Sequence, residues 1–181
     1  MAREVVDDDR DIADLLISTP PSPRPTTMSW HQQWQSLVKP EYRERVIGAH
    51  RADIVLRDGT VVELQHSPIS AEEIRERESH YQRMLWIFDV SEAFAAERFI
   101  LRRREGYFTF KWNNARRSLE AVSAPLFFDI GGVMLRVRKL YGRRPETYDG
   151  SGIASRRPCA GWGYRLHTRQ FLAVYFRDIL A

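Results

Sequence analysis

The clearest pattern of hydrophobic and polar positions lies between residues 51 and 66, where two short β-branched runs flank an Asp-Gly pair. Such runs around Asp58-Gly59 are typical of a β-hairpin, because Asp-Gly adopts the backbone conformations that tight turns require. We therefore expect strands near residues 51–56 and 60–66. Side chains of a strand alternate between two faces, so the turn between these strands decides which of them lie together.

The length of the turn determines where two acidic side chains point. A two-residue loop would pair Asp53 with Leu64 and would put Glu63 on the opposite face of the hairpin. A three-residue loop over residues 57–59 brings Asp53 directly opposite Glu63, and it favours the glycine that the sequence has at its third position. We predict the three-residue loop.

In that register one face of the hairpin is acidic and the other is apolar. The first face carries Asp53, Val55, Val61, Glu63 and Gln65, and the second, which we expect to be core, carries Ala52, Ile54, Leu56, Val62 and Leu64. Two carboxylates roughly 5 Å apart on opposed strands repel each other. A shifted pKa, a basic neighbour or a divalent cation must compensate. Arg51 or Arg57 on a solvated face would be the simplest basic neighbour.

Periodicity predicts further helices and strands on both sides of the hairpin. Ser29 can cap a helix that runs to about Val38, and residues 70–73 form a capping box that opens a helix through about Arg83. The apolar run 84–90 is typical of a strand buried on both faces. We further expect a segment over 91–104 that is helical at first and then increasingly basic, a strand over 107–112, a short helix over 115–122 and a second hairpin over 125–138.

The two ends of the chain differ in composition from its centre. Residues 1–27 contain a proline-rich stretch, and we expect them to be a disordered or loosely docked tail. The remainder of this 181-residue chain favours one domain over 28–141, with 142–181 packed on the same domain. Within that last segment we expect a long Gly/Arg-rich loop over 142–163, which includes Gly161 and Gly163, and an amphipathic helix over 165–180.

The composition excludes several kinds of site. A single cysteine excludes an internal disulfide, no apolar run reaches the length of a membrane span, and the acidic N-terminus does not resemble a secretory signal, so we expect a cytoplasmic protein with no membrane partner. The histidines lack the spacing of a zinc site. There is also no Walker A loop, dinucleotide fingerprint or nucleophile elbow.

The net charge of +4 is unevenly distributed, because the second half of the chain is basic. Such a half is compatible with a nucleic-acid partner, although basic surface is also ordinary solubility chemistry. The candidates for contacts to phosphate groups are Arg102, Arg103, Arg104, Arg116 and Arg117.

The residues around the two carboxylates resemble a known family. Asp53, nine intervening residues and then Glu63-Leu-Gln resemble the Asp…Glu-x-Lys core of the PD-(D/E)XK nucleases. The run Glu-Leu-Gln-His-Ser-Pro-Ile-Ser from Glu63 onward, with His31-Gln-Gln-Trp and His50-Arg-Ala-Asp, is similar to the competence protein CoiA-like nuclease family. The resemblance covers roughly residues 27–90. It implies an α/β fold with a restriction-endonuclease-like αβββαβ core, a mixed central sheet flanked by helices, and additional C-terminal strands and a helix.

The resemblance also implies roles for individual residues. Asp53 and Glu63 would bind Mg²⁺, with Mn²⁺ as an alternative, and Gln65 would stand in the place of the superfamily lysine. His31, which is otherwise a surface or capping histidine, would approach the catalytic site from the first helix. The residues that would support this site are Tyr81, Gln35, Ser67 and Arg77.

The function implied by the resemblance is metal-dependent hydrolysis of phosphodiester bonds, in DNA more than in RNA. Two alternatives stay open. One is a nucleic-acid-binding relative without turnover, which the uncharged Gln35 and Gln65 favour. The other is an interaction domain that uses the acidic face and binds no nucleic acid. The oligomeric state also stays open.

Overall fold

The computed structural model describes residues 28–141 and 159–181, and every structural statement below concerns these residues. The expected tail over 1–27 and positions 142–158 of the expected loop lie outside them. The described strands are β1 (Arg43–Ile47), β2 (His50–Val55), β3 (Val61–Gln65), β4 (Met84–Asp89), β5 (Phe99–Arg104), β6 (Tyr107–Trp112), β7 (Leu126–Asp129), β8 (Val133–Tyr141) and β9 (Cys159–His167). The described helices are α2 (Trp30–Ser36), α3 (Ala71–Tyr81), α4 (Ser91–Ala95) and α5 (Thr168–Tyr175), with 3₁₀ turns η1 (Pro40–Tyr42) and η2 (Arg117–Ala121).

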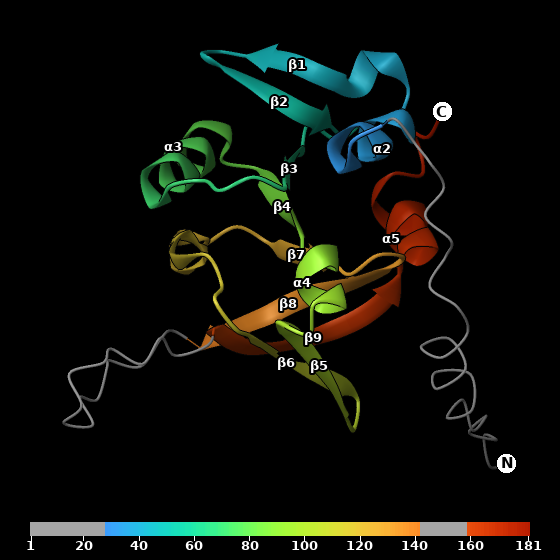
Figure 1. Cartoon of the computed structure of the whole chain (residues 1–181). Coiled ribbons are helices and arrows are strands. Elements are labelled where there is room, and N and C mark those ends of the chain that lie inside the picture. The colour runs from blue at the N-terminus through green and yellow to red at the C-terminus, as the bar shows by residue number, and fades with distance from the viewer. Residues whose placement is uncertain (1–27, 142–158) are drawn as a thin grey trace, which may run out of the picture.

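These strands form one nine-stranded sheet in the order β1-β2-β3-β4-β7-β8-β9-β6-β5. The pairs β3–β4 and β4–β7 are parallel, and the other neighbours are antiparallel. The element order from α2 to β4 is the αβββαβ order that the sequence implies, and the mixed sheet with flanking helices confirms the expected α/β fold (Figure 1).

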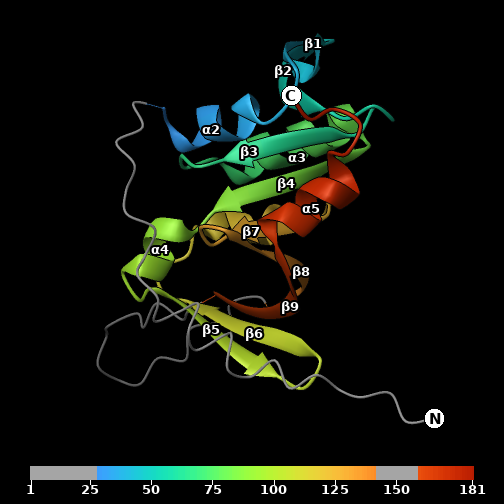
Figure 2. The ribbon, with the colours of Figure 1, turned by 90° about the vertical axis from the view of Figure 1, so that its right-hand side faces the viewer.

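The two faces of the sheet are covered by different elements. Helices α2 and α5 pack on one face, where Trp34, Phe171 and Phe176 belong to one buried cluster. Helix α3 lies on the other side of strands β3 and β4, where its Ile74 and Tyr81 belong to a second cluster (Figure 2). The central strands are therefore buried on both faces, as the apolar run 84–90 predicts.

The far edge of the sheet curves back over its centre. The rings of Phe99 on β5 and Phe110 on β6 lie 5.5 and 5.3 Å from the ring of Phe128 on β7, measured between centroids. Strands β8 and β9 separate β7 from β6 in the sheet, so only a strongly curved sheet brings these rings together. The β5–β6 hairpin therefore closes part of the core.

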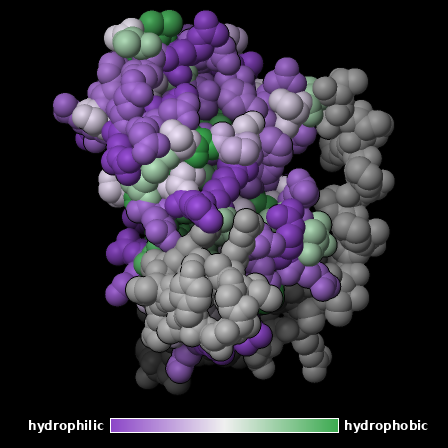
Figure 3. Space-filling view, turned by 60° about the vertical axis from the view of Figure 1, so that its left-hand side comes forward, coloured by the Kyte–Doolittle hydropathy of each residue, from purple (hydrophilic) through white to green (hydrophobic). Residues whose placement is uncertain are grey.

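Helix α3 begins as predicted, because Ser70 and Glu73 form the reciprocal contacts of a capping box. The exposed side chains along the helix include Glu72, Arg75 and Glu76, as expected for a solvated face. The side of the molecule that carries α3 accordingly shows mainly hydrophilic residues (Figure 3). None of the described helices is long and apolar enough to cross a membrane.

The helix expected at the start of the segment 91–104 is α4, which ends at Ala95, and the basic part of the segment forms strand β5 over 99–104, which the sequence pattern did not predict. Phe99 is buried, Leu101 packs against the same core, and the basic residues of the strand face solvent. Phe99 and Leu101 are alternate residues on the core side of the strand, and the three exposed arginines at its end are the kind of charged side chains by which edge strands avoid further pairing.

The predicted loop and helix at the C-terminal end are also wrong in part. Residues 159–167 form strand β9, and α5 begins only at Thr168. Gly161 and Gly163 are strand residues and not loop residues: a Cβ at Gly161 would lie 2.2 Å from the carbonyl oxygen of Lys139. A glycine inside a strand marks a close approach of neighbouring backbone, which reads in sequence like a loop.

Candidate active site

The hairpin between β2 and β3 has the predicted three-residue loop. The backbone N–H of Leu56 donates to the carbonyl of Thr60 at 2.8 Å, and the glycine that ends the loop has a φ of +85°. The pairs Ile54–Val62 and Val55–Val61, continued by one residue on each strand, place Asp53 across from Glu63, and the two carboxylates repel each other. The juxtaposition of the two carboxylates, which the turn length predicts, is therefore present in the structure.

The faces of the hairpin differ from the prediction in one respect. Val55 and Val61, expected beside the acidic pair, are buried in the cluster that includes residues of α3. Ala52 belongs to that cluster too, although the alternation places it with Ile54 on the opposite face. The acidic pair therefore lies at the border of a buried core and not on an open, solvated face.

Asp53 is held at both of its carboxylate oxygens. Oδ2 accepts a hydrogen bond from the backbone N–H of Leu64 at 2.8 Å, and Oδ1 lies 2.9 Å from Nε2 of His31. The hydrogen bond to Asp53 raises the pKa of His31 above its ordinary value, although partial burial opposes the change. Helix α2 thus brings His31 to the site, as the resemblance implies, and the contact with Asp53 favours the charged form of His31.

Glu63 is almost completely buried, with 1% of its surface exposed. Its Oε2 pairs with the guanidinium of Arg77, and its Oε1 is buried with no hydrogen-bond partner among the described residues. Burial raises the pKa of Glu63 to about 7, repulsion from Asp53 contributes to this rise, and Arg77 opposes both effects. The basic neighbour of the acidic pair is therefore Arg77, since Arg51 instead pairs with Glu44.

Helix α3 supplies two side chains that act on Glu63 from the second core. Arg77 and Tyr81 are four residues apart, so they lie on the same face of the helix. The hydroxyl of Tyr81 is buried without a hydrogen-bond partner among the described residues. Burial, with the charge of Glu63, raises the pKa of Tyr81 to about 12, which keeps the hydroxyl protonated at neutral pH.

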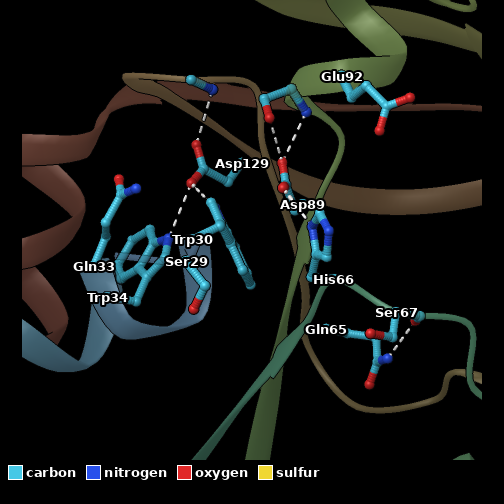
Figure 4. A network of polar contacts seen from close by, with 12 residues as sticks. Ser29, Trp30, Gln33, Trp34, Gln65, His66, Ser67, Asp89, Glu92 and Asp129 are labelled. Atoms are coloured by element: carbon cyan, nitrogen blue, oxygen red, sulfur yellow. Dashed lines mark hydrogen bonds and ion pairs between the residues drawn. The ribbon is translucent and has the colours of Figure 1, made fainter. Parts of the chain in front are cut away.

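The two glutamines of the predicted site differ in position. Nε2 of Gln35 donates to Oε1 of Glu44 at 3.1 Å and to the carbonyl oxygen of Asp53 at 3.5 Å, so it lies at the site. The amide of Gln65 donates to the carbonyl of Ser67 and is directed along its own chain (Figure 4). Ser67 contributes its carbonyl oxygen to this contact, and that oxygen also accepts from Arg116.

The five predicted phosphate-binding arginines do not lie at the acidic pair. Three of them, residues 102–104, lie on β5 at the opposite edge of the sheet, with five strands between β3 and β5. Arg116 is half-buried and donates to the carbonyl oxygens of His66 and Ser67, so it anchors the connection after β3. Burial lowers the pKa of Arg116. Arg117 is exposed at the start of η2.

The sequence reasoning missed a polar network at the C-terminal ends of the parallel strands (Figure 4). Oδ2 of Asp129 accepts from the indole N–H groups of Trp30 and Trp34, each at 2.9 Å. Oδ2 of Asp89 lies 2.9 Å from Nδ1 of His66. The network fixes α2 against the strand ends. The signal in the sequence was that two apolar strands, β4 and β7, both end in Asp.

The acidic pair could hold a divalent cation. The described residues contain no group of three or more His, Cys, Asp or Glu side chains arranged to hold a metal ion. Mg²⁺, however, is commonly bound by one or two carboxylates with water in its remaining positions. The unpartnered, buried Oε1 of Glu63 beside Asp53 fits such an ion, because a buried acceptor without a donor is costly.

Comparison with known proteins gives one match. Residues 26–122 match the family model described as competence protein CoiA, nuclease-like domain. No curated protein and no solved structure matches the chain. The matched residues include both carboxylates, His31 and the whole of α3.

Proposed function

The chain belongs to the competence protein CoiA nuclease-like domain family, and from this premise we propose that it hydrolyses phosphodiester bonds of DNA with a divalent metal ion. The observation that supports this proposal is the pairing of Asp53 with a buried Glu63 whose Oε1 has no partner in the described part of the chain. Two carboxylates so placed repel each other, and a divalent cation shared between them would remove that repulsion.

The proposed site assigns the metal to two residues. Asp53 and Glu63 would hold Mg²⁺, or Mn²⁺ in its place, with water completing the coordination. A bound ion supplies a water of lowered pKa and neutralises charge on the scissile phosphate. The contacts of Asp53 with Leu64 and His31 fix its carboxylate before substrate arrives, and such preorganisation reduces the cost of binding.

The remaining residues would position water and balance charge. Gln65 replaces a lysine and cannot serve as a base, but its amide can orient a water molecule if it turns away from Ser67. Protonated His31, favoured by its raised pKa, would supply part of the positive charge that the missing lysine does not. Tyr81, whose pKa is about 12, can donate a hydrogen bond but not act as a base at neutral pH.

The ion pair between Arg77 and Glu63 sets a condition on this proposal. The guanidinium occupies one carboxylate oxygen, so a metal ion must bind through the other oxygen or displace Arg77. Since a metal ligand must be deprotonated, binding should strengthen as pH rises through about 7, the pKa of Glu63.

A second candidate function is a nucleic-acid-binding relative without turnover. The specific observations that favour it are the pairing of Glu63 with Arg77 and the direction of Gln65 toward Ser67. In that case the guanidinium of Arg77 would be the permanent partner of the acidic pair. DNA binding would then be equally strong with a metal chelator.

The experiment is a nuclease assay on single-stranded DNA, duplex DNA and RNA with Mg²⁺ or Mn²⁺, using the parent chain, Asp53→Asn and Glu63→Gln. The proposal expects cleavage of DNA by the parent and loss of cleavage in both variants. Glu72→Gln, which removes an exposed carboxylate from α3, is the matched control and should cleave like the parent. Unchanged cleavage by both site variants would show that the site is wrong. Binding of DNA without any cleavage by the parent would favour the second function.

A further inference from the structure

Strands β5, β6, β9 and β8, which are neighbours in that order, carry a surface distinct from the acidic pair. On β6, Phe108, Phe110 and Trp112 belong to or pack against the core beneath the curved sheet. Because side chains alternate, Tyr107 and Thr109 point to the opposite, outer face. The outer face of these four strands is therefore built from side chains that the core does not use.

Cross-strand pairing arranges the outer side chains in two rows. The first row consists of Arg104, Tyr107, Tyr164 and Arg136, and the second of Arg102, Thr109, Trp162 and Lys139. Tyr107 and Tyr164 follow from continuing the β6–β9 register by one pair beyond Phe108 and Gly163. Each row has a basic side chain at both ends, and neither row contains an acidic residue. With strands about 4.8 Å apart, the two basic ends of a row bracket the middle of the surface across roughly 14 Å. We call these eight residues the outer platform.

The aromatic rings at the middle of the outer platform form one group, in which Trp162 is half-buried between two exposed tyrosines. The ring of Trp162 lies 5.6 Å from that of Tyr107 and 5.7 Å from that of Tyr164, in edge-to-face contacts. Tyr107 and Tyr164 remain 38% and 47% exposed. Clustered exposed rings on a folded chain mark an interaction site.

The backbone beneath the rings is closely packed. Gly161 and Gly163 flank Trp162 on β9, and a Cβ at either would lie within 2.2 Å of a carbonyl oxygen of β8. The strand that carries two of the three rings is thus pressed against its neighbour. A rigid strand presents its aromatic side chains at a lower entropic cost of binding than a loop.

Rings in the middle and basic side chains at the ends are the two parts of a surface for single-stranded nucleic acid. Unpaired bases stack on aromatic side chains, and Arg or Lys contacts the phosphates. A duplex hides the faces of its bases, so it can use only the charged part. We propose that the outer platform binds single-stranded DNA or RNA by stacking bases on Tyr107, Trp162 and Tyr164.

This binding surface is independent of the proposed metal site. The outer platform lies at the opposite edge of the sheet from β2 and β3, as the ends of the ribbon show (Figure 1). Four of its residues lie outside the range that matches the nuclease-like family: Arg136, Lys139, Trp162 and Tyr164. Binding at the outer platform needs no metal ion, so it can be measured where no cleavage occurs.

The test is fluorescence anisotropy with a labelled oligothymidylate of about 16 nucleotides and a duplex of the same length, both in the presence of EDTA. The parent chain should bind the single strand more tightly than the duplex. Tyr164→Ala and Trp162→Ala should each weaken single-strand binding at least about fivefold and leave duplex binding unchanged. Tyr164→Phe, which keeps the ring, should bind like the parent, whereas Arg104→Ala should weaken both ligands.

Matched controls distinguish base stacking on the rings from a general loss of positive charge or of folded protein. Arg45→Ala removes an exposed basic side chain from β1 at the other edge, and it should change neither affinity. Thermal melts must show that each alanine variant is folded.

Equal affinity for single strand and duplex, or parent-like binding by folded Tyr164→Ala and Trp162→Ala, would overturn the proposal. A concentration-dependent dimer that Tyr164→Ala dissociates would assign the face to a second copy of the chain and also overturn it. Oligonucleotide binding without cleavage would support the outer platform while the nuclease proposal failed.

Discussion

Replacing Glu63 with Gln should make the chain more stable at high pH and should have little such benefit at low pH. The carboxyl group is buried, and its pKa is raised to about 7 by burial and by repulsion from Asp53. A carboxyl whose pKa is raised in the folded state stabilises folding only while it is protonated. That contribution is complete below its ordinary pKa of 4.5 and is lost as pH rises through about 7. Glutamine resembles the protonated form at every pH.

The magnitude follows from the two pKa values. Each pH unit between 4.5 and about 7 changes the unfolding free energy by roughly 1.36 kcal/mol per proton, so the parent should lose about 3 kcal/mol that Glu63→Gln keeps. The variant leaves Arg77 without its carboxylate partner. The Arg77 side chain is 30% exposed and can be hydrated. Leaving it without a carboxylate partner therefore adds to the unfolding free energy of the variant an offset that does not depend on pH in this range.

The assay is urea unfolding of the parent and Glu63→Gln at intervals from pH 4.5 to 8.5, with EDTA present. The informative quantity is the difference between the two unfolding free energies at each pH, because titrations shared by both chains cancel. The Glu72→Gln variant gives the effect of the same substitution at a side chain that is 79% exposed. If the difference in unfolding free energy between the parent and Glu63→Gln changes by less than about 0.5 kcal/mol from pH 4.5 to 8.5, a raised pKa at Glu63 is refuted.

Three other changes test separate parts of the structure. His31→Gln removes a group whose pKa is raised by Asp53, so the stability advantage of the parent over this variant should fall as pH rises above 6.5, in thermal melts from pH 5 to 9. Gly161→Ala should lower the unfolding free energy by about 3 kcal/mol or more, because the new Cβ would lie 2.2 Å from a carbonyl oxygen. Gly106→Ala has open space around its Cβ but a φ of +77°, and it should lower the unfolding free energy by about 1 kcal/mol. Urea unfolding measures both losses. Asp129→Asn turns an amide toward indole donors and should cost about 1–3 kcal/mol in the same melts.

The hairpin and its acidic pair could be predicted from the sequence because local chemistry determines them. The Asp-Gly pair favours one loop length, the loop length fixes the register, and the register places Asp53 opposite Glu63. Helix α3 was equally accessible, since its capping box lies within four residues. In these segments the information needed for the structure is contained in short stretches of chain.

The parts that the sequence did not predict depend on strand pairing and packing outside the segment itself. Residues 99–104 become a strand because β6 pairs with them, and β9 forms between β6 and β8 although its glycines resemble a loop. The partner of Glu63 also required tertiary structure. Arg77 was one of several charged residues on α3, and only the packing of that helix selects it.

The two proposed surfaces differ in how far the sequence alone reveals them. The acidic pair lies where local signals are strong, in the segment that matches the nuclease-like family. The outer platform depends on long-range pairing of β5, β6, β9 and β8, so its rows are invisible until the strand order is known. The fold therefore decides what the three arginines 102–104 can contact. Along a helix they would form a general basic face, but on β5 only alternate residues lie on the outer platform. Arg102 and Arg104 lie on the same face of the sheet as the aromatic rings of the outer platform. The proposed single-strand binding surface is therefore inferred from the alternation of side chains along the strands and not from net charge.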